Sequence, residues 1–135
     1  MDKKPNLHLM VGLPRSGKST IANTMGYPIV NPDSIRLALH GQAFIGDAEP
    51  MVWVIAKYMV KSLFIAGHSD VILDATNITK ARRDEWKSKK WNRQFVVVDT
   101  PKDVCLERAN EALIPIIERM ANEFEPVSDE ERDNG

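Results

Sequence analysis

The sequence of 135 residues has few of the features that mark secreted, metal-binding or strongly charged proteins. Cys105 is the only cysteine, so the chain cannot form an intramolecular disulfide and offers no cysteine framework for a metal ion. We expect Cys105 to be a small apolar residue on a helix, in a protein of a reducing cytoplasm. The formal net charge is only −1, so any nucleic-acid or membrane partner must be recognised locally.

Long hydrophobic runs are also absent. The apolar run at 7–11 has only the length of a strand, and the run at 51–67 is interrupted by Lys57 and Lys61. Neither suits a signal peptide or a membrane span, so we expect no membrane association and a cytoplasmic location, or the host cytoplasm for a phage protein. No internal repeat or linker is present, and no protein partner can be inferred.

What the sequence does contain is a regular alternation of short apolar runs with amphipathic stretches. We expect strands at 7–11, 28–30, 71–73 and 95–98. We expect helices at 18–25, 33–40, 49–66, 79–91, 102–110 and 114–124. This alternation predicts an α/β fold with a parallel sheet and helices on both of its faces.

The chain length suits a single domain with a sizeable core. Within 49–66, an apolar face at helical spacing is expected to pack in that core, and it consists of Val52, Ile55, Met59, Leu63 and Ala66. The last residues are acidic and have no apolar pattern. We therefore predict one domain over residues 1–124 and a disordered tail over 125–135.

A glycine-rich segment, GLPRSGKST, lies between the first predicted strand and the first predicted helix. Gly12, Gly17, Lys18 and Ser19 satisfy the Walker A pattern G-x-x-x-x-G-K-[ST]. The glycines let several backbone N–H groups point at one anion, and Lys18 adds a full charge for the β and γ phosphates. We expect the whole loop to bind nucleotide phosphates, including Pro14, Arg15, Ser16 and Thr20. Arg15 either touches phosphate or faces solvent.

The same loop predicts a magnesium site. The Ser19 hydroxyl is placed to ligate Mg²⁺, and such an ion normally has a second anchor at the end of a neighbouring strand. Asp74 follows the apolar residues 71–73 and so lies at the carboxyl end of a predicted strand, where open parallel sheets bind ligands. An ordinary turn aspartate is the alternative for Asp74, and Asp99, after the strand at 95–98, is a rival acid.

The reaction type must come from other residues. In the stretch NPDSIR, Asp33 and Arg36 are three residues apart at the start of a predicted helix, so their side chains share one face. A carboxylate there can accept the proton of an attacking hydroxyl, and an arginine can grip a substrate phosphate. The pair indicates phosphoryl transfer to an alcohol. The alternative is a helix-capping aspartate with Arg36 as its surface ion-pair partner.

Three motifs, GLPRSGKST, NPDSIR and VILDATNITKARRDEW, occur in an order and spacing typical of one family. Over nearly the whole chain to about Phe124, the sequence resembles the kinase domain of bacteriophage polynucleotide 5′-hydroxyl kinase and its P-loop relatives. The resemblance implies a three-layer P-loop NTPase fold with four or five parallel strands, and ATP and Mg²⁺ as cofactors. It also implies that Asp33 is the general base, that Arg36 holds the acceptor's phosphate, and that a lid with arginines covers the transferring phosphate.

The sequence departs from the phage enzyme around the acceptor. Ala75 separates Asp74 from the TN pair, so Asp74 either holds metal through water or orients Arg36. Pro32 stands where the phage enzyme has a basic substrate contact. No aspartate motif of the phosphatase half is present, so we predict no 3′-phosphatase activity.

The lid candidate also differs. Residues 108–115 offer only Arg108, and Arg119 follows one helix later, whereas the phage lid is richer in arginine. Arg108 is therefore either a cationic clamp or adenine-stacking residue, or a solvated helix end.

The stretch 79–93 combines basic residues with Trp86 and Trp91. The basic residues are Lys80, Arg82, Arg83, Lys87, Lys89, Lys90 and Arg93. Cations and aromatics together can hold a nucleic-acid strand. The alternative is a charge-rich amphipathic helix whose tryptophans face the core.

Three functions are compatible with these residues. The first is an ATP-dependent kinase of a hydroxyl group, with the 5′ end of a single-stranded nucleic acid as the leading acceptor and with catalysis by Lys18, Asp33, Arg36 and Arg108. The second keeps this chemistry but phosphorylates a nucleoside, a sugar or another small molecule. The third is a nucleotide-binding module with incidental ATPase activity, in which Asp33→Ala leaves nucleotide turnover unchanged.

Overall fold

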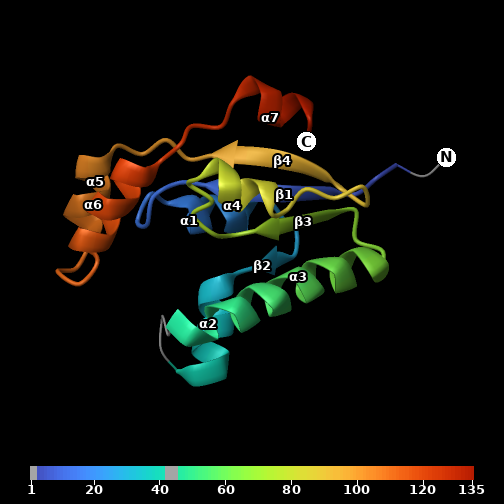
Figure 1. Ribbon diagram of the computed structural model, residues 1–135, viewed down its shortest axis with the longest axis horizontal. Coiled ribbons are helices and arrows are strands. Elements are labelled where there is room, and N and C mark those ends of the chain that lie inside the picture. The colour runs from blue at the N-terminus through green and yellow to red at the C-terminus, as the bar shows by residue number, and fades with distance from the viewer. Residues whose placement is uncertain (1–2, 42–45) are drawn as a thin grey trace.

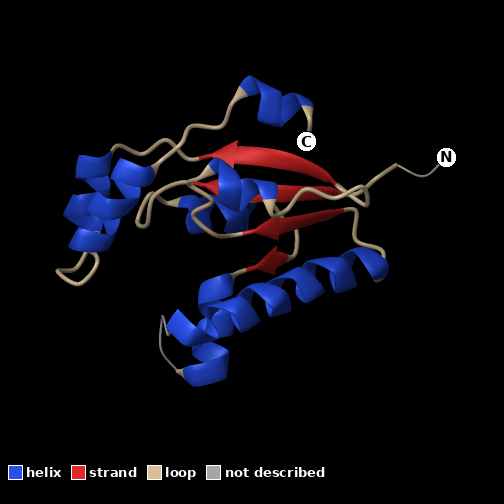
Figure 2. Cartoon of the chain, viewed as in Figure 1, coloured by secondary structure: helices blue, strands red, loops and turns tan. Residues whose placement is uncertain are grey.

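A four-stranded parallel sheet organises the computed structural model, which describes residues 3–41 and 46–135. The strands are β1 (Asn6–Val11), β2 (Ile29–Val30), β3 (Asp70–Leu73) and β4 (Asn92–Val97), in the spatial order β2-β3-β1-β4. Every pairing is parallel, and Figure 2 shows the arrowheads pointing the same way. The predicted α/β fold with a parallel sheet is confirmed.

Helices connect and cover the strands (Figure 1). They are α1 (Lys18–Thr24), α2 (Pro32–His40), α3 (Glu49–Ile65), α4 (Lys80–Asp84), α5 (Lys102–Arg108), α6 (Ile114–Glu123) and α7 (Asp129–Asp133), with a 3₁₀ turn η1 (Gly46–Ala48) before α3. In Figure 1, α5 and α6 lie beyond the carboxyl ends of the strands, whereas both chain termini lie at the opposite end. Among the described residues, no helix is both long and apolar enough to cross a membrane.

The core has a separate cluster on each face of the sheet. On one face, α3 packs Val52, Ala56 and Val60 against alternate strand residues such as Leu9 and Leu73. On the other face, a second cluster consists of Met10, Ala22 and Ile72. Alternation along the strands explains this division, because successive side chains of a strand point to opposite faces. A third cluster, under α5 and α6, contains Cys105, which is fully buried as the sequence predicts.

The core face of α3 matches the predicted one only in part. Of the five residues expected in the core, Val52 is buried, Ile55 and Leu63 are partly buried and pack against the core cluster, and Met59 and Ala66 are exposed. The buried residues Val52, Ala56 and Val60 recur every four residues and form a narrow stripe. The helix is apolar on several sides, so its periodicity identified only part of the buried face.

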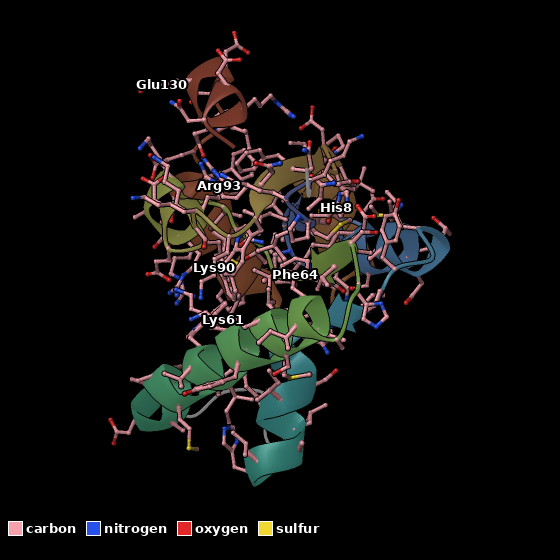
Figure 3. All side chains as sticks on the ribbon, turned by 90° about the vertical axis from the view of Figure 1, so that its right-hand side faces the viewer. His8, Lys61, Phe64, Lys90, Arg93 and Glu130 are labelled. Atoms are coloured by element: carbon pink, nitrogen blue, oxygen red, sulfur yellow. The ribbon has the colours of Figure 1, made fainter. Side chains whose placement is uncertain are left out.

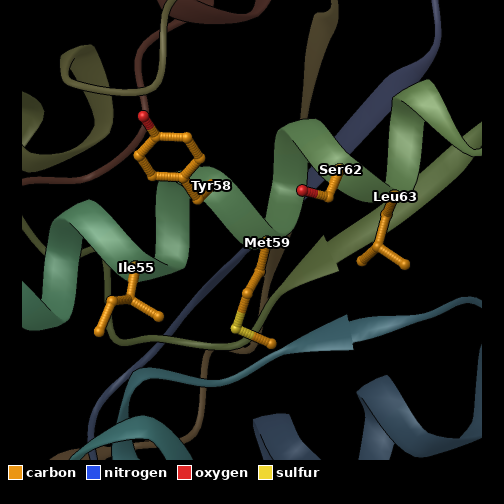
Figure 4. Close-up of a pocket in the computed structure, with 5 residues that line it drawn as sticks. All are labelled: Ile55, Tyr58, Met59, Ser62 and Leu63. Carbon is orange, nitrogen blue, oxygen red and sulfur yellow. The ribbon is translucent and has the colours of Figure 1, made fainter.

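One side of α3 carries a shallow hollow that the sequence did not indicate (Figure 4). Its lining residues are Ile55, Tyr58, Met59, Ser62 and Leu63. All of the lining comes from one helix, and its polar groups are only the hydroxyls of Tyr58 and Ser62, so the hollow offers no charged group for chemistry.

The predicted helix at 79–91 is much shorter in the structure. Helix α4 ends at Asp84, and the chain then turns so that Trp86 and Trp91 are both buried. The indole Nε1 of Trp91 donates to the carbonyl oxygen of Trp86 at 2.8 Å, which holds the turn closed. Of the two interpretations of this stretch, the one in which the tryptophans face the core is therefore correct for Trp86 and Trp91.

The acidic segment after residue 124 contains a helix rather than the predicted disordered tail. Ser128 and Glu131 form a capping box at the start of α7, in which each side chain accepts a backbone N–H of the other residue. Glu131 is buried and accepts hydrogen bonds from Arg83 at 2.7 and 3.0 Å. A buried ion pair to another part of the chain orders this segment, and composition alone cannot indicate such a pair.

Candidate active site

The glycine-rich loop follows β1 at the carboxyl end of the sheet and is tightly folded. A methyl group at Gly12 would lie 2.8 Å from Ser16 Oγ and 3.0 Å from the Val98 carbonyl oxygen, so only glycine fits. Gly17 has a φ of 94° and precedes Lys18, the first residue of α1. Thr100 donates to the carbonyl oxygen of Ser16 at 2.7 Å and ties the loop to the end of β4.

Ser19 and Asp74 lie side by side between α1 and the end of β3. The Ser19 hydroxyl donates to Asp74 Oδ2 at 2.7 Å. Asp74 is 5% exposed, and its other oxygen, Oδ1, is buried without a hydrogen-bond partner among the described residues. A hydroxyl beside a carboxylate with a free oxygen suits Mg²⁺, which takes oxygen ligands and keeps several waters. The rival acid, Asp99, is exposed beyond β4.

Asn31 connects this pair to the start of α2. Its side-chain oxygen accepts the backbone N–H of Asp33 at 2.8 Å and caps the helix. Its side-chain nitrogen donates to Asp74 Oδ2 at 3.4 Å. Asp74 therefore contacts Ser19 and Asn31, whereas the bonds of Arg36 go to other carboxylates. Asn31 was not among the predicted site residues, although an asparagine two residues before Asp33 is a recognisable helix cap.

Asp33 and Arg36 form the predicted pair on one face of α2. Arg36 donates to Asp33 Oδ1 at 2.6 Å, and the Asp33 side chain is 73% exposed. Arg36 also donates from Nε and from its second terminal nitrogen to the two oxygens of Glu49, at 2.9 and 2.7 Å. These bonds lower the pKa of Glu49 and raise that of Arg36. Glu49 was not predicted, because it lies thirteen residues away on α3.

Arg108 reaches the phosphate loop from the last turn of α5. Its guanidinium donates to the carbonyl oxygen of Arg15 at 3.2 Å, and the same nitrogen would lie 3.9 Å from a methyl group placed on Gly17. The structure thus brings Arg108 beside the loop. The Arg15 side chain is exposed, and Arg119 lies on α6 with an exposed side chain as well.

The TN pair of the third motif supports the loop from behind. The Thr76 carbonyl oxygen accepts the backbone N–H of Gly12 at 3.0 Å. Asn77 is buried with a φ of 47°, and its side chain donates to the carbonyl oxygen of Met10 at 2.8 Å. Asparagine tolerates this left-handed conformation better than most residues. Both residues therefore fix the position of the loop relative to β1.

The structure divides the basic residues of 79–93 among different places. Arg83 and Arg93 are buried and make structural hydrogen bonds. Figure 3 shows Lys90 and Arg93 at the end of the molecule that carries the chain termini, opposite α5 and α6. Lys80 and Arg82 lie on α4, after the carboxyl end of β3. The seven residues therefore do not form one continuous surface.

The parallel sheet and the phosphate loop together define a P-loop kinase fold, which binds nucleotides. The chain belongs to the AAA domain family, which matches residues 7–111. No curated protein matches the chain.

Solved structures of similar fold include complexes and sugar kinases. A chain from a Pnkp1/Rnl/Hen1 complex matches with a TM-score of 0.71 and 27% identity, over 82% of this chain and 40% of that chain. A chain of the Pnkp1/Rnl/Hen1 RNA repair complex has a TM-score of 0.70 and 18% identity, over 93% of this chain and 48% of its own length.

A gluconokinase from Sinorhizobium meliloti 1021 has a TM-score of 0.63 and 21% identity, over 97% of this chain and 81% of its own. By contrast, this chain spans less than half the length of each of the two Pnkp1/Rnl/Hen1 chains. The predicted P-loop kinase-like fold is confirmed.

Proposed function

We propose that the protein is an ATP-dependent kinase that transfers the γ-phosphate to the 5′-hydroxyl of a polynucleotide. The observation that carries the proposal is the Asn31 side chain, which hydrogen-bonds to the backbone of Asp33 and to the carboxylate of Asp74. The start of α2, which carries the exposed Asp33 carboxylate, is thereby tied to Asp74, the partner of Ser19. An acceptor hydroxyl bound at Asp33 would approach the γ-phosphate from this helix. Such positioning is the main contribution of a protein to phosphoryl transfer.

The chemistry assigns one task to each of four side chains. The acceptor oxygen forms a bond to the γ-phosphorus while the bond to the β–γ bridging oxygen breaks, and Asp33 takes the acceptor proton. Lys18 offsets the charge that builds on the leaving ADP, and Arg108 covers the phosphate loop. Arg36 holds a phosphate of the acceptor next to Asp33.

Ser19 and Asp74 would hold Mg²⁺, Asp74 through its free oxygen. The ion, when bound, neutralises charge on the β and γ phosphates. The protein's own residues orient this site, since Ser19 and Asn31 both donate to Oδ2 of the Asp74 carboxylate.

Two lines of support favour a polynucleotide acceptor. The three sequence motifs match those of polynucleotide 5′-hydroxyl kinases, and the 27%-identical structure belongs to a Pnkp1/Rnl/Hen1 complex. A small-molecule kinase is the second candidate. It is favoured by the three hydrogen bonds that already engage Arg36, because an acceptor without a phosphate would leave them intact.

Transfer of label from γ-³²P-ATP tests the proposal. The acceptors are 5′-hydroxyl DNA, 5′-hydroxyl RNA, nucleoside 3′-monophosphates and sugars, each with Mg²⁺. We expect label on the oligonucleotide 5′ ends, and a loss of about 10²- to 10⁴-fold in Asp33→Asn with ATP binding retained. Asp129→Asn, which removes an acid from the first turn of another helix, should keep full activity.

Other outcomes decide against the polynucleotide assignment. Label on a sugar or a nucleoside 3′-monophosphate, with none on the oligonucleotides, would assign the small-molecule kinase. ATP hydrolysis that Asp33→Asn leaves unchanged, without transfer to any acceptor, would assign the nucleotide-binding module instead.

A further inference from the structure

A row of cations stacked on tryptophans runs along the seam between α3 and α4. The Arg36 guanidinium carbon lies 5.8 Å from the ring centroid of Trp53, and the guanidinium carbon of Arg82 lies 4.5 Å from the same ring. Trp53 meets Trp86 edge to face at 6.5 Å, and Lys57 Nζ lies 5.3 Å from the Trp86 ring. We call Arg36, Trp53, Arg82, Trp86 and Lys57 the cation–tryptophan row.

The row begins at the candidate acceptor site. Arg36 donates to Asp33, so the first cation of the row touches the proposed base. Arg82 comes from α4 and lies over the same Trp53 ring as Arg36, but its side chain is more exposed to solvent. An acceptor strand whose 5′ end lies at Asp33 would therefore pass Arg36 first and Arg82 second.

Arg82 has hydrogen-bonding capacity that Arg36 lacks. Arg36 is 13% exposed and uses its guanidinium on two carboxylates. Arg82 is 41% exposed and, among the described residues, its side chain donates only from one terminal nitrogen, to Glu85 at 3.1 Å. An arginine has five N–H donors, so Arg82 retains donors for a phosphate.

The carboxylates that face the row leave Arg82 available. Both oxygens of Glu49 are engaged by Arg36. Glu85, the partner of Arg82, is 52% exposed. An ion pair that is so open to water contributes little to the stability of the fold. A nucleic-acid phosphate can thus replace Glu85 at small cost.

Stacking on Trp53 makes Arg82 suited to this task. A guanidinium that lies over an indole is held by the ring and still presents the donors at its edge. Arginine held in this way binds a phosphate with two hydrogen bonds, in a fixed direction.

We propose that Arg82, stacked on Trp53, binds the second backbone phosphate of a single-stranded acceptor. This inference rests on the proposed kinase function and adds a preference, among its acceptors, for oligonucleotides with at least two phosphates.

Acceptors of increasing length test the inference. The series is a nucleoside 3′-monophosphate, a dinucleotide with a 3′-phosphate and a trinucleotide with a 3′-phosphate, all with a free 5′-hydroxyl. In the unmodified protein, kcat/KM should rise about tenfold from the first to the second acceptor. Arg82→Ala should remove that rise and leave the rate on the monophosphate within about twofold.

Two control variants separate the subsite from general charge and from folding. Lys80 lies on the same helix and pairs with Asp84. Lys80→Ala therefore removes a nearby cation, and it should keep the rise in kcat/KM with acceptor length. Arg82→Lys keeps the positive charge but not the planar guanidinium that binds a phosphate with two hydrogen bonds. It should keep only part of the rise in kcat/KM. A rise that persists in Arg82→Ala, or a loss that is equal for all acceptors, would overturn the inference.

A binding measurement separates failure of the inference from failure of the proposed function. Fluorescence anisotropy of a 3′-labelled 5′-hydroxyl oligonucleotide gives the dissociation constant at salt concentrations from about 50 to 200 mM. Arg82→Ala should reduce the slope of log K against log salt by about 0.7, the value for one phosphate contact on a single strand. This result would support the subsite even if no transfer occurred, whereas an unchanged slope or no binding at all would overturn it.

Discussion

Arg36 on α2 donates to both carboxylate oxygens of Glu49 on α3, at 2.9 and 2.7 Å. The two residues come from helices joined by a connection that includes residues 42–45, outside the described part of the chain. Their side chains are only 13% and 17% exposed, so the pair is largely withdrawn from water. Because Arg36 also donates to Asp33, Glu49 fixes the direction of the guanidinium that we propose to meet the acceptor.

Glu49→Gln should therefore impair use of the acceptor while ATP binding stays intact. An amide can accept only one of the two hydrogen bonds, so Arg36 loses its fixed direction, and a misplacement of about 1 Å can cost about 100-fold in rate. We expect kcat/KM for the acceptor to fall between 10- and 100-fold, with an unchanged dissociation constant for ATP. Glu118→Gln, on the exposed side of α6, is the control. Normal acceptor kinetics in Glu49→Gln would show that the ion pair serves only stability.

Asn31 allows its two hydrogen bonds to be separated by substitution. Asn31→Ala removes both the helix cap and the bond to Asp74, and it should lower the free energy of unfolding by about 1 kcal/mol. Asn31→Ser keeps a side-chain oxygen that can cap α2, so the free energy of unfolding should stay within about 0.5 kcal/mol of the unmodified protein. The shorter serine side chain removes the amide N–H group that donates to Asp74.

The two Asn31 variants should nevertheless share a catalytic defect. Both release one side of the Asp74 carboxylate, so both should need more Mg²⁺ for half-maximal rate, by up to about 10-fold, as is typical when a residue that orients a metal ligand is lost. Urea unfolding and magnesium titrations of the rate measure the two effects. A normal magnesium requirement in Asn31→Ser would restrict Asn31 to the role of a helix cap.

The phosphate loop and the sheet were predictable because their signals are local. Gly12, Gly17 and Lys18 occupy fixed spacings between a strand and a helix, and the predicted strands match the observed ones within a few residues. Asp33 and Arg36 were likewise predicted as a pair, because three residues along a helix bring side chains to one face.

The partners contributed by distant segments were not predictable. Glu49 and Arg82 approach the site through tertiary packing, and nothing in the local sequence joins them to Arg36 or Trp53. Arg83 also looked like a surface charge, because its burial depends on Glu131, 48 residues later. The helix α7 is different, since the pattern Ser128-Asp129-Glu130-Glu131 is a capping box that the sequence contained.

Cys105 should be unreactive in the folded protein. Burial raises the pKa of its thiol, so little thiolate is available to an alkylating reagent, and the side chain is fully covered. We expect negligible labelling by iodoacetamide at pH 8 without denaturant and complete labelling in urea, as followed by mass spectrometry. Fast labelling of the folded protein would contradict the packing of α5 and α6 around this residue.

The buried pair of Arg83 and Glu131 should make the carboxyl-terminal segment a large contributor to stability. Arg83 is fully buried and bonds to both oxygens of Glu131, so Glu131→Gln leaves a buried charge without its partner. Breaking such a pair costs about 3–5 kcal/mol. Exposed Glu130→Gln, one residue earlier in the same helix, is the matched control and should change the free energy of unfolding by less than about 0.5 kcal/mol.

The pH dependence of this contribution follows from the direction of the pKa shift. The hydrogen bonds from Arg83 lower the pKa of Glu131 in the folded protein, so its stabilisation is complete above the unfolded value of about 4.3 and is lost as the pH falls through the lower folded value. Urea unfolding from pH 7 to pH 3 should therefore show a difference between the unmodified protein and Glu131→Gln that shrinks only below about pH 4.3. A difference that is constant over this range, or absent at pH 7, would mean that α7 does not depend on the ionised carboxylate for its attachment to α4.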